Sequence, residues 1–358
     1  MKTLSVLHID FEKTWRGGQQ QLVWLVEGLK KSGDKNFVLC RPGSALSAGL
    51  KENVAAWFAV RPLFELDIIA AYKTAGIINS LKPDVIHLHS AHAHTIGIMA
   101  AKISRHKAKV VTSRRVDFHI KNRWKYHCAD RIIAISNGVK NVLLSDGIPE
   151  EKISVVHSGV DLNRFDNVEG SYLYRELGII KGQPVIGIVA ALAPHKDHRN
   201  FLKAAQLVKM EIPDAVFAIV GAGSLKKDLT DFADSLGISG STIFTGFRND
   251  VPQLLSIFSL FVLSSYLEGL GTSLVDAMAS GLPIVATKVG GIPEVVADGL
   301  NGYIVPPRDH KMLSEKIIRI LKDEDLKKKF SAQSKLYSQN FSKEKMAEGT
   351  KKVYLEII

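Results

Sequence analysis

Short apolar runs alternate with segments of helical periodicity along most of the chain. The first apolar run covers residues 4–9. It is followed by a glycine pair and then by a segment of helical periodicity at residues 19–31. From Leu22 onward, apolar side chains recur at the i, i+3, i+4 and i+7 positions, which is typical of a helix with one buried face. Further runs predict buried strands over residues 36–40, 84–88, 109–112 and 131–135. Strands separated by helices, with few hairpin signals, indicate βαβ units and a parallel sheet.

The same alternation starts again near Pro184. Apolar runs there predict a second set of strands over residues 185–190, 215–220, 242–245, 260–264 and 283–286. We therefore predict an α/β protein with two Rossmann-like, doubly wound parallel-sheet domains. The first covers residues 1–165 and the second residues 166–340. We expect the helical segment 341–358 to pack back on the first domain.

The segment after the strand at residues 260–264 carries the strongest chemical signal. A glycine-rich turn leads into a helix over about residues 273–279, and free N–H groups at a helix start suit an anionic phosphate. Glu268 lies on the turn, while Thr272 and Asp276 are four residues apart and share a helix face. The alternative is a plain strand–turn–helix in which Asp276 is a solvated surface residue.

Three blocks of this half resemble the family 4 retaining glycosyltransferases of GT-B fold. Residues 268–287 read EGLGTSLVDAMASGLPIVAT, and residues 290–294 and 298–302 read GGIPE and DGLNG. The resemblance covers nearly the whole chain and implies two domains that face a cleft. It also implies that the second domain holds most of a nucleotide-sugar donor. One position departs from the family, because its second acidic residue is usually Glu and is Asp276 here.

The resemblance assigns roles to individual residues. Glu268 would contact the donor sugar and stabilise developing positive charge, and Lys196 would bind the diphosphate. The usual arginine partner is replaced by Ala191, which leaves His195, Arg199 or Arg248 as substitutes. The implied donor-binding residues are Gly17, Gly18, Gly221, Gly223, Phe247, Arg248, Gly269, Leu270, Gly271, Thr272 and Asp276. Phe247 is equally compatible with a place in the core.

In the first domain the resemblance points to the ends of two strands. Gly17 and Gly18 would lie against the diphosphate, with Arg16 beside them. His89 follows the strand at residues 84–88 and would act at the cleft as a catalytic residue. Many relatives have a cleft histidine after the next strand, where this chain has Arg114 and Arg115. Because arginine does not shuttle protons near neutral pH, we expect Arg114 to bind an acceptor or donor phosphate instead.

The positive charge is concentrated in the first half of the chain. Residues 1–165 hold 24 Lys and Arg and 14 acidic residues, which gives +10 of the total +11. Residues 102–131 hold ten basic and two acidic residues, with aromatic residues among them. We therefore predict an anionic or lipid-linked acceptor, such as a lipopolysaccharide core, and a reversible contact with an anionic membrane surface. The acceptor-binding residues would be Arg16, Arg114, Arg115, Lys121, Arg123 and Lys125.

Two alternatives to membrane contact remain, namely a solvated basic face and recognition of a phosphorylated soluble glycan. Three other functions are also considered. A sugar-nucleotide epimerase would need acid–base groups placed for proton abstraction, and a non-catalytic nucleotide-sugar-binding subunit would be favoured only if Glu268 were missing. Nucleic-acid binding is not expected, because the donor block outweighs the basic run.

The rest of the composition indicates a cytoplasmic enzyme without a cofactor. Hydrophobic residues make up 46% of the chain and only two cysteines occur, Cys40 and Cys128. The apolar run at residues 4–9 is short for a signal peptide, and no run approaches the ~18 apolar residues of a membrane span. No metal is expected, because no cysteine or carboxylate cluster completes a site with His195 and His198. The nucleotide-sugar is a substrate.

Overall fold

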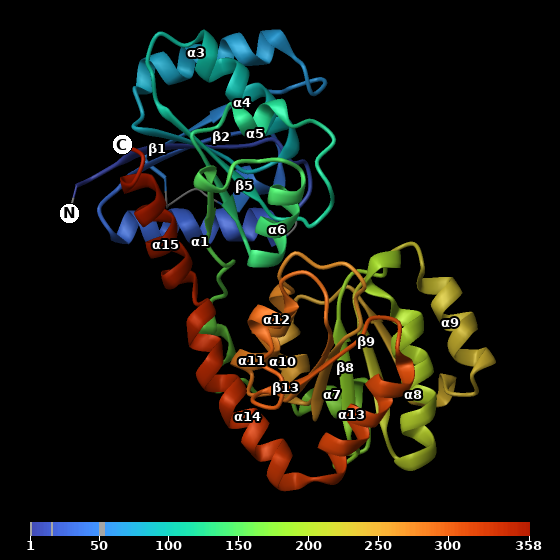
Figure 1. Cartoon of the computed structure of the whole chain (residues 1–358). Helices are drawn as coiled ribbons and strands as arrows, with labels where there is room; N and C mark the ends of the chain where they lie inside the picture. The colour runs from blue at the N-terminus through green and yellow to red at the C-terminus, as the bar shows by residue number, and fades with distance from the viewer. Residues whose placement is uncertain (1, 16, 50–53) are drawn as a thin grey trace. The chain divides into compact units, whose positions relative to one another are not determined.

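The computed structural model of the chain describes residues 2–15, 17–49 and 54–358 and divides into two compact units (Figure 1). Unit 1 combines Met1–Gly159 with Ser342–Ile358, and unit 2 is Val160–Phe341. The division after residue 159 therefore comes slightly earlier than the expected one after residue 165. The final segment is counted with unit 1, where its helix packs on the first helix of the chain.

Unit 1 is built on a seven-stranded parallel sheet in the order β3-β2-β1-β4-β5-β6-β7. Its strands are β1 (Ser5–Asp10), β2 (Lys35–Cys40), β3 (Ala56–Ala59), β4 (Val85–Leu88), β5 (Lys109–Arg114), β6 (Arg131–Ala134) and β7 (Ile153–Val155). The apolar runs miss β3 and β7 at the two edges. β3 is only partly buried and β7 has three residues, so neither gives a continuous apolar run.

Helices cover both faces of this sheet. They are α1 (Gly17–Lys31), α2 (Ala45–Gly49), α3 (Ile68–Leu81), α4 (Ala91–Ile103), α5 (Trp124–His127), α6 (Asn137–Ser145) and α15 (Lys343–Leu355), with the 3₁₀ turn η1 (Glu150–Lys152). α1 packs against α15, and α3 packs against α4 (Figure 1). Tyr354 of α15 is fully buried in the core beside Trp24 and Leu25 of α1.

Unit 2 holds a six-stranded parallel sheet in the order β10-β9-β8-β11-β12-β13. Its strands are β8 (Val185–Val189), β9 (Val216–Val220), β10 (Thr242–Gly246), β11 (Leu260–Leu263), β12 (Ile284–Thr287) and β13 (Gly302–Val305). Five of them coincide with predicted strands to within about two residues. The last, β13, begins with Gly302 and Tyr303 and was not predicted, because a glycine and a half-buried tyrosine weaken its apolar pattern.

The helices of unit 2 complete the doubly wound arrangement. They are α7 (Tyr172–Glu176), α8 (His198–Glu211), α9 (Lys226–Ser235), α10 (Val251–Ser256), α11 (Thr272–Ala279), α12 (Ile292–Val295), α13 (His310–Lys322) and α14 (Glu324–Ser338). Short 3₁₀ turns are η2 (Leu162–Phe165), η3 (Pro194–Lys196), η4 (Ser239–Ser241) and η5 (Gln339–Phe341). α8 packs on α13, and α11 packs on α14 (Figure 1).

Each sheet has one position where the strand order reverses. In unit 1 it lies between β1 and β4, and in unit 2 between β8 and β11. The loops that leave two such strands diverge to opposite faces, which opens a crevice at the carboxyl ends of the strands. Sites are therefore expected after β1 and β4 and after β8 and β11. Among the described residues, no helix is both long enough and apolar enough to cross a membrane.

Candidate functional sites

In unit 2, a lysine and a glutamate meet at the reversal of strand order. Lys196 ends η3, which follows β8, and Glu268 lies in the loop that follows β11. The Lys196 ammonium group donates a hydrogen bond to Glu268 Oε2 in an ion pair whose side chains are 17% and 13% exposed. The Ser265 hydroxyl lies 3.3 Å from the same oxygen. The two residues to which the sequence assigned catalysis and diphosphate binding thus contact each other directly.

Backbone hydrogen bonds hold these two loops together. The Tyr266 N–H donates to the carbonyl of His195 at 2.9 Å, and the buried Ser264 hydroxyl donates to the carbonyls of Lys196 and Asp197, each at 3.0 Å. The Thr287 hydroxyl at the end of β12 donates to the carbonyl of Ser265. Because three strand ends support the loops, Glu268 and Lys196 are held in place before any ligand binds.

The helix start predicted to bind phosphate lies directly after Glu268. Gly271 caps α11 with φ of +83°, which favours glycine, and a β-carbon there would come within 2.9 Å of Leu274. Thr272 is the first helical residue. Burial raises the pKa of Asp276 to about 7, opposed by the nearby positive charge of Arg164 in η2. Asp276 is half-buried, and its role as a ribose ligand stays a prediction.

The second glycine turn has a structural reason of its own. Gly221 has φ of +146°, and a β-carbon there would lie 2.0 Å from the carbonyl oxygen of Ala190. At Gly223 the corresponding distance is 2.4 Å to the carbonyl oxygen of Leu192. Both glycines therefore let the loop after β9 pack on the backbone after β8. That packing alone explains them, and their contact with a nucleotide stays a prediction.

Two of the three residues suggested in place of the missing arginine, Arg248 and Arg199, are held by carboxylates. Arg248 donates to Asp250 from Nε at 2.8 Å and from Nη2 at 2.6 Å, and to Glu176 from Nη1 at 2.5 Å. Arg199 makes two hydrogen bonds to Asp228, at 3.2 Å and 2.6 Å. Neither guanidinium contacts Lys196 or Glu268 in these bonds.

The exposure of Phe247 and the position of Arg308 could not be predicted from the sequence. Phe247 is 74% exposed, so it does not belong to the core and its ring is open to a ligand. Arg308 follows β13 and was not predicted as a site residue. Its guanidinium lies 4.7 Å from the ring centre of Tyr266, on the loop that leads to Glu268. Burial raises the pKa of Asp197, and the charge of Arg308 is one of the effects that oppose this. No local motif marks Arg308, because its position depends on β13 pairing with β12.

In unit 1, the reversal of strand order gathers Asp10, His89 and Arg115. Asp10 ends β1 and accepts a hydrogen bond from the Gln19 side chain at 2.9 Å. Arg115 follows β5, and its Nη2 lies 3.4 Å from His89 Nδ1. A β-carbon on Gly18 would lie 3.6 Å from Arg115 Cδ, so this arginine lies over the start of α1. The contact of Gly17 and Gly18 with a diphosphate stays a prediction. Arg16 falls outside the described residues.

A chain of buried hydrogen bonds determines how His89 faces Arg115. Asn36 donates from Nδ2 to the carbonyl of Asp34, which turns its Oδ1 toward His8 Nε2 at 3.1 Å. His8 Nε2 must then donate, so His8 Nδ1 accepts from His89 Nε2 at 3.1 Å. His89 Nδ1 is left with its lone pair toward Arg115. Burial lowers the pKa of His89 well below its usual value, followed by the effect of His87, so the ring is neutral.

This geometry gives His89 a positioning role on Arg115. Both ring nitrogens are engaged, and a neutral, buried imidazole with a fixed tautomer is poorly suited to exchange protons with a ligand. A direct catalytic role for His89 stays a prediction. Burial lowers the pKa of Arg115 to about 10, with Asp10 acting in the opposite direction, so its guanidinium remains charged at neutral pH.

His8, His87 and His89 also bring their ring nitrogens within 4.8 Å of one another, a spacing that a metal ion would accept. His87 is hydrogen-bonded to the Tyr354 hydroxyl at 2.5 Å and to the Ser113 hydroxyl at 2.8 Å. A metal ion would have to break these bonds and those of His8 and His89, beside the charge of Arg115. The three rings are therefore better described as a hydrogen-bonded group than as a metal centre.

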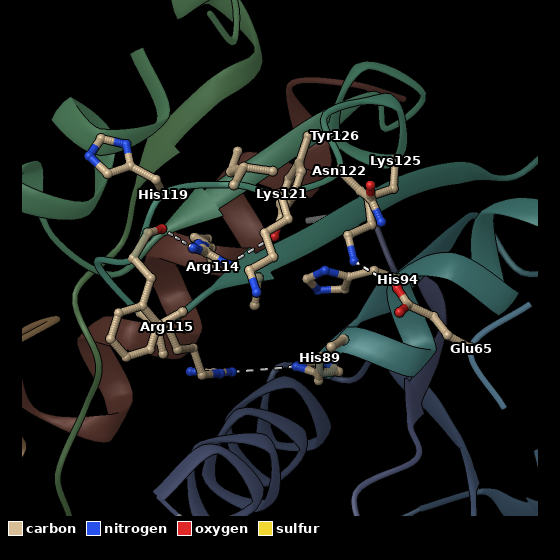
Figure 2. Close-up of a pocket in the computed structure, with 15 residues that line it drawn as sticks. Glu65, His89, His94, Arg114, Arg115, His119, Lys121, Asn122, Lys125 and Tyr126 are labelled. Carbon is tan, nitrogen blue, oxygen red and sulfur yellow. Dashed lines mark hydrogen bonds and ion pairs between the residues drawn. The ribbon is translucent and has the colours of Figure 1, made fainter. Parts of the chain in front are cut away.

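A pocket of about 630 Å³ opens beside this group (Figure 2). Its charged and ring-bearing lining includes Glu65, His89, His94, Arg114, Arg115, Phe118, His119, Lys121, Lys125 and Tyr126. Four of the six residues assigned to the acceptor thus line one pocket. Arg123 does not line it, although it is exposed on the same segment. Residues at the end of β5 and residues of the basic segment that follows β5 both line this pocket.

Inside the pocket, Arg114 is less available than expected. Its Nη1 donates to the Tyr126 hydroxyl at 3.2 Å and its Nη2 donates to the Phe118 carbonyl, as the dashed lines in Figure 2 show. Tyr126 is one of the aromatic residues of segment 102–131, which was expected to contact a membrane, but it is 2% exposed and belongs to the core. Arg115, with its contacts to His89, is therefore the better placed of the two arginines to receive an anion.

One further prediction about this segment needs correction. Lys125 was expected on the surface, but it is only 9% exposed and its Nζ lies 3.2 Å from Glu65 Oε1. His94, which also lines the pocket, lies in α4 and is 4% exposed. Burial, with the charges of Lys125 and Arg114, lowers the pKa of His94 to about 3. Lys121 and Arg123 are exposed, as expected.

Comparisons with known proteins cover both units. Residues 173–337 match the model of Glycosyl transferases group 1, and residues 15–164 match that of Glycosyltransferase Family 4. The UDP-Gal:alpha-D-GlcNAc-diphosphoundecaprenol alpha-1,3-galactosyltransferase of Escherichia coli is 24% identical over 345 residues, with 90% of this chain and 89% of that protein covered. An uncharacterised glycosyltransferase of Methanocaldococcus jannaschii is 30% identical over 306 residues, covering 81% of this chain and 80% of that protein.

Among solved structures, the chain resembles Anabaena HepE in complex with UDP and glucose. The TM-score is 0.86 at 22% sequence identity, with 99% of this chain and 100% of that chain covered. This likeness confirms the predicted fold class, in which two Rossmann-like parallel-sheet domains make up a GT-B protein.

Proposed function

The chain belongs to the family 4, group 1 glycosyltransferases, and from this premise we propose that it transfers a sugar from a nucleotide-sugar donor to a hydroxyl group of a lipid-linked, anionic glycan, with retention of anomeric configuration. The Lys196–Glu268 pair carries the proposal. It lies at the reversal of strand order in unit 2, where nucleotides bind in doubly wound folds.

In the proposed reaction, the bond between the anomeric carbon and the leaving phosphate oxygen breaks as the acceptor oxygen bonds to the same face of that carbon. The proton of the acceptor hydroxyl passes to the leaving phosphate oxygen. Glu268 stabilises the positive charge that develops on the sugar, and Lys196 and the N–H groups at the start of α11 stabilise the negative charge on the diphosphate. Groups of unit 2 stabilise both developing charges, and the proposed reaction uses no metal ion or cofactor.

The second cation of the diphosphate site is proposed to be Arg308. It is stacked on Tyr266, whose N–H is hydrogen-bonded to His195, so its charge lies beside the same loops that carry Glu268 and Lys196. Arg199 and Arg248 are occupied by carboxylates. Arg308 thus takes the place of the arginine that Ala191 replaces.

The acceptor is proposed to bind in the basic pocket of unit 1. The Escherichia coli relative is named for a diphosphoundecaprenol-linked acceptor. Arg115 and Lys121 on the lining would bind the phosphates of such a molecule or of a lipopolysaccharide core, because guanidinium and ammonium groups form charge-assisted hydrogen bonds to phosphate. We place the reaction in the cytoplasm, at the inner face of the membrane.

Glu268→Ala tests the assignment. Turnover of the correct nucleotide-sugar and acceptor should fall by about 10²-fold or more, because one transition-state electrostatic contact is lost. Calorimetric titration of UDP-, GDP- and ADP-sugars first identifies the donor, and the affinity for its nucleoside diphosphate should change much less than turnover. Asp228→Ala, at an exposed carboxylate of unit 2, is the control. All assays contain EDTA, so that no metal ion contributes to turnover. Near-normal turnover by a folded Glu268→Ala protein would rule out the proposed role of Glu268 in stabilising the charge on the sugar.

A further inference from the structure

Unit 1 presents an apolar surface that the sequence pattern did not reveal. It consists of large hydrophobic side chains from the β3–α3 loop and the first turns of α3, and we call it the Leu63–Tyr72 surface. Its members and their exposed fractions are Leu63 79%, Phe64 58%, Leu66 60%, Ile68 57%, Ile69 70% and Tyr72 62%. Single exposed hydrophobic residues are ordinary, but a contiguous group of six marks an interaction site.

The loop that carries this surface is firmly held. Asp67 caps α3 by accepting from the Ala70 N–H at 2.9 Å, and its other oxygen accepts from the Leu63 N–H at 3.0 Å. Arg41 donates to the carbonyl of Pro62 at 2.7 Å. With the backbone held by these bonds, the apolar side chains point outward as a built feature of the loop. A hollow of about 560 Å³ runs among them, with Arg61 and Lys73 at its margin.

The apolar surface continues into the basic pocket through shared residues. Phe64 and Leu66 line both the apolar hollow and a second hollow, which Glu65, Asn122 and Trp124 also line. Glu65 and Asn122 in turn line the basic pocket (Figure 2). Hydrophobic side chains and cationic side chains therefore lie next to each other along one surface of unit 1.

The charges around this surface suit anionic head groups. Glu65 is neutralised by Lys125 and also accepts from the Thr95 hydroxyl at 2.8 Å, and the carboxylate of Asp67 is used by the helix cap. The two acidic residues of the loop are thus paired or hydrogen-bonded, although the Glu65 side chain is 44% exposed, while Arg61 and Lys73 also line the apolar hollow. Aromatic and aliphatic side chains fringed by basic ones are the arrangement with which proteins enter the boundary between head groups and acyl chains.

We propose that the Leu63–Tyr72 surface inserts into the lipid bilayer and places the basic pocket at the level of the lipid head groups. The inference rests on the proposed lipid-linked acceptor. Insertion of the surface would explain how a phosphate carried by a membrane lipid reaches the pocket. Insertion of apolar side chains persists at high salt, whereas attraction between Lys121 or Arg123 and anionic lipids is screened. Membrane binding therefore has a salt-resistant part that the charge pattern of the sequence does not predict.

Sedimentation with vesicles of phosphatidylcholine and phosphatidylglycerol tests the proposal. The unmodified protein should remain bound to these vesicles in about 0.5 M salt, where the screening length is only a few ångströms. The double variant Phe64→Asp/Ile69→Asp should bind at least about tenfold more weakly, because each lost apolar side chain accounts for roughly a tenfold change. The matched control Ile180→Asp/Met210→Asp changes side chains of unit 2 that are 72% and 74% exposed and should bind like the unmodified protein.

The outcomes separate this proposal from the proposed function. Vesicle binding needs neither donor nor acceptor, so it is measured even if no sugar is transferred. Transfer to a short-chain, water-soluble acceptor should be unchanged in Phe64→Asp/Ile69→Asp, which also shows that the variant is folded. The proposal is overturned if the unmodified protein leaves the vesicles at high salt. It is equally overturned if the double variant binds the vesicles as tightly as the unmodified protein does. It is also overturned if ultracentrifugation shows a dimer that only this variant dissociates, since a second copy then covers the surface.

Discussion

Arg308 shows how one side chain acquires a role through its neighbours. It has a positive φ of 64°, follows β13, and stacks on Tyr266. If it is the second diphosphate cation, Arg308→Ala should weaken binding of the donor's nucleoside diphosphate about tenfold, and that of the nucleoside monophosphate much less. A charge-assisted contact to phosphate accounts for about this factor.

Titration calorimetry of both nucleotides measures the difference, with Arg199→Ala as the control. Arg199 is also a half-exposed arginine stacked on an aromatic ring, Phe232, but it is paired with Asp228. It should leave both affinities unchanged. Equal losses for the two nucleotides in Arg308→Ala would place this arginine away from the diphosphate.

Among the secondary-structure elements, the C-terminal helix α15 is held against the rest of unit 1 by a buried ion pair. The Lys351 ammonium group lies 2.9 Å from an oxygen of Asp34, and their side chains are 7% and 0% exposed. Asp34 also accepts from the Leu4 N–H at 2.9 Å. Removing one partner leaves a buried charge without its counter-charge, so Lys351→Met should lower the free energy of unfolding of unit 1 by about 3–5 kcal/mol.

Urea unfolding followed by tryptophan fluorescence isolates this unit, because the four tryptophans Trp15, Trp24, Trp57 and Trp124 all belong to it. Lys109→Met is the control, since Lys109 pairs with Asp130 at the surface of the same unit, where the two side chains are 46% and 36% exposed. Its effect should stay within about 0.5 kcal/mol. A small effect of Lys351→Met would show that α15 contributes little to the stability of the unit.

For the molecule as a whole, the buried histidines of unit 1 predict sensitivity to acid. Burial lowers the pKa of His8 to about 4, and burial with nearby charges lowers that of His94 to about 3. The unfolded chain therefore binds more protons than the folded one below about pH 6.5, and stability falls as the pH decreases from there toward the folded values. At pH 5 each of these two histidines accounts for a loss of about 2 kcal/mol.

The variant His94→Phe removes one such group. Between pH 7 and pH 5, the unfolding free energy of unit 1 should fall by about 2 kcal/mol less in this variant than in the unmodified protein, as measured by urea unfolding at both pH values. His92→Phe changes an exposed histidine of the same helix and should leave the pH dependence as it was. A pH dependence of His94→Phe identical to that of the unmodified protein would mean that His94 is not held neutral.

Local sequence patterns are sufficient to predict the two sheets and the loops that carry Lys196 and Glu268. Central parallel strands are buried on both faces, so β1, β4, β8 and β11 are continuous apolar runs, while the edge strands β3 and β7 are not. Glu268 and Lys196 are recognisable because each lies in a local motif directly after such a strand.

Which side chains meet depends on the packing of the folded chain, and the structure was needed to show it. Packing paired Glu268 with Lys196, brought Arg308 to Tyr266, and buried Lys125 and Tyr126, which the charge pattern had placed at the surface. It also left the apolar side chains of the Leu63–Tyr72 surface exposed. Hydrophobic periodicity and motifs report on residues that are near in sequence, whereas ion pairs, burial and surface patches depend on contacts between distant segments. Those contacts exist only after the strands have been ordered and the loops packed on their ends.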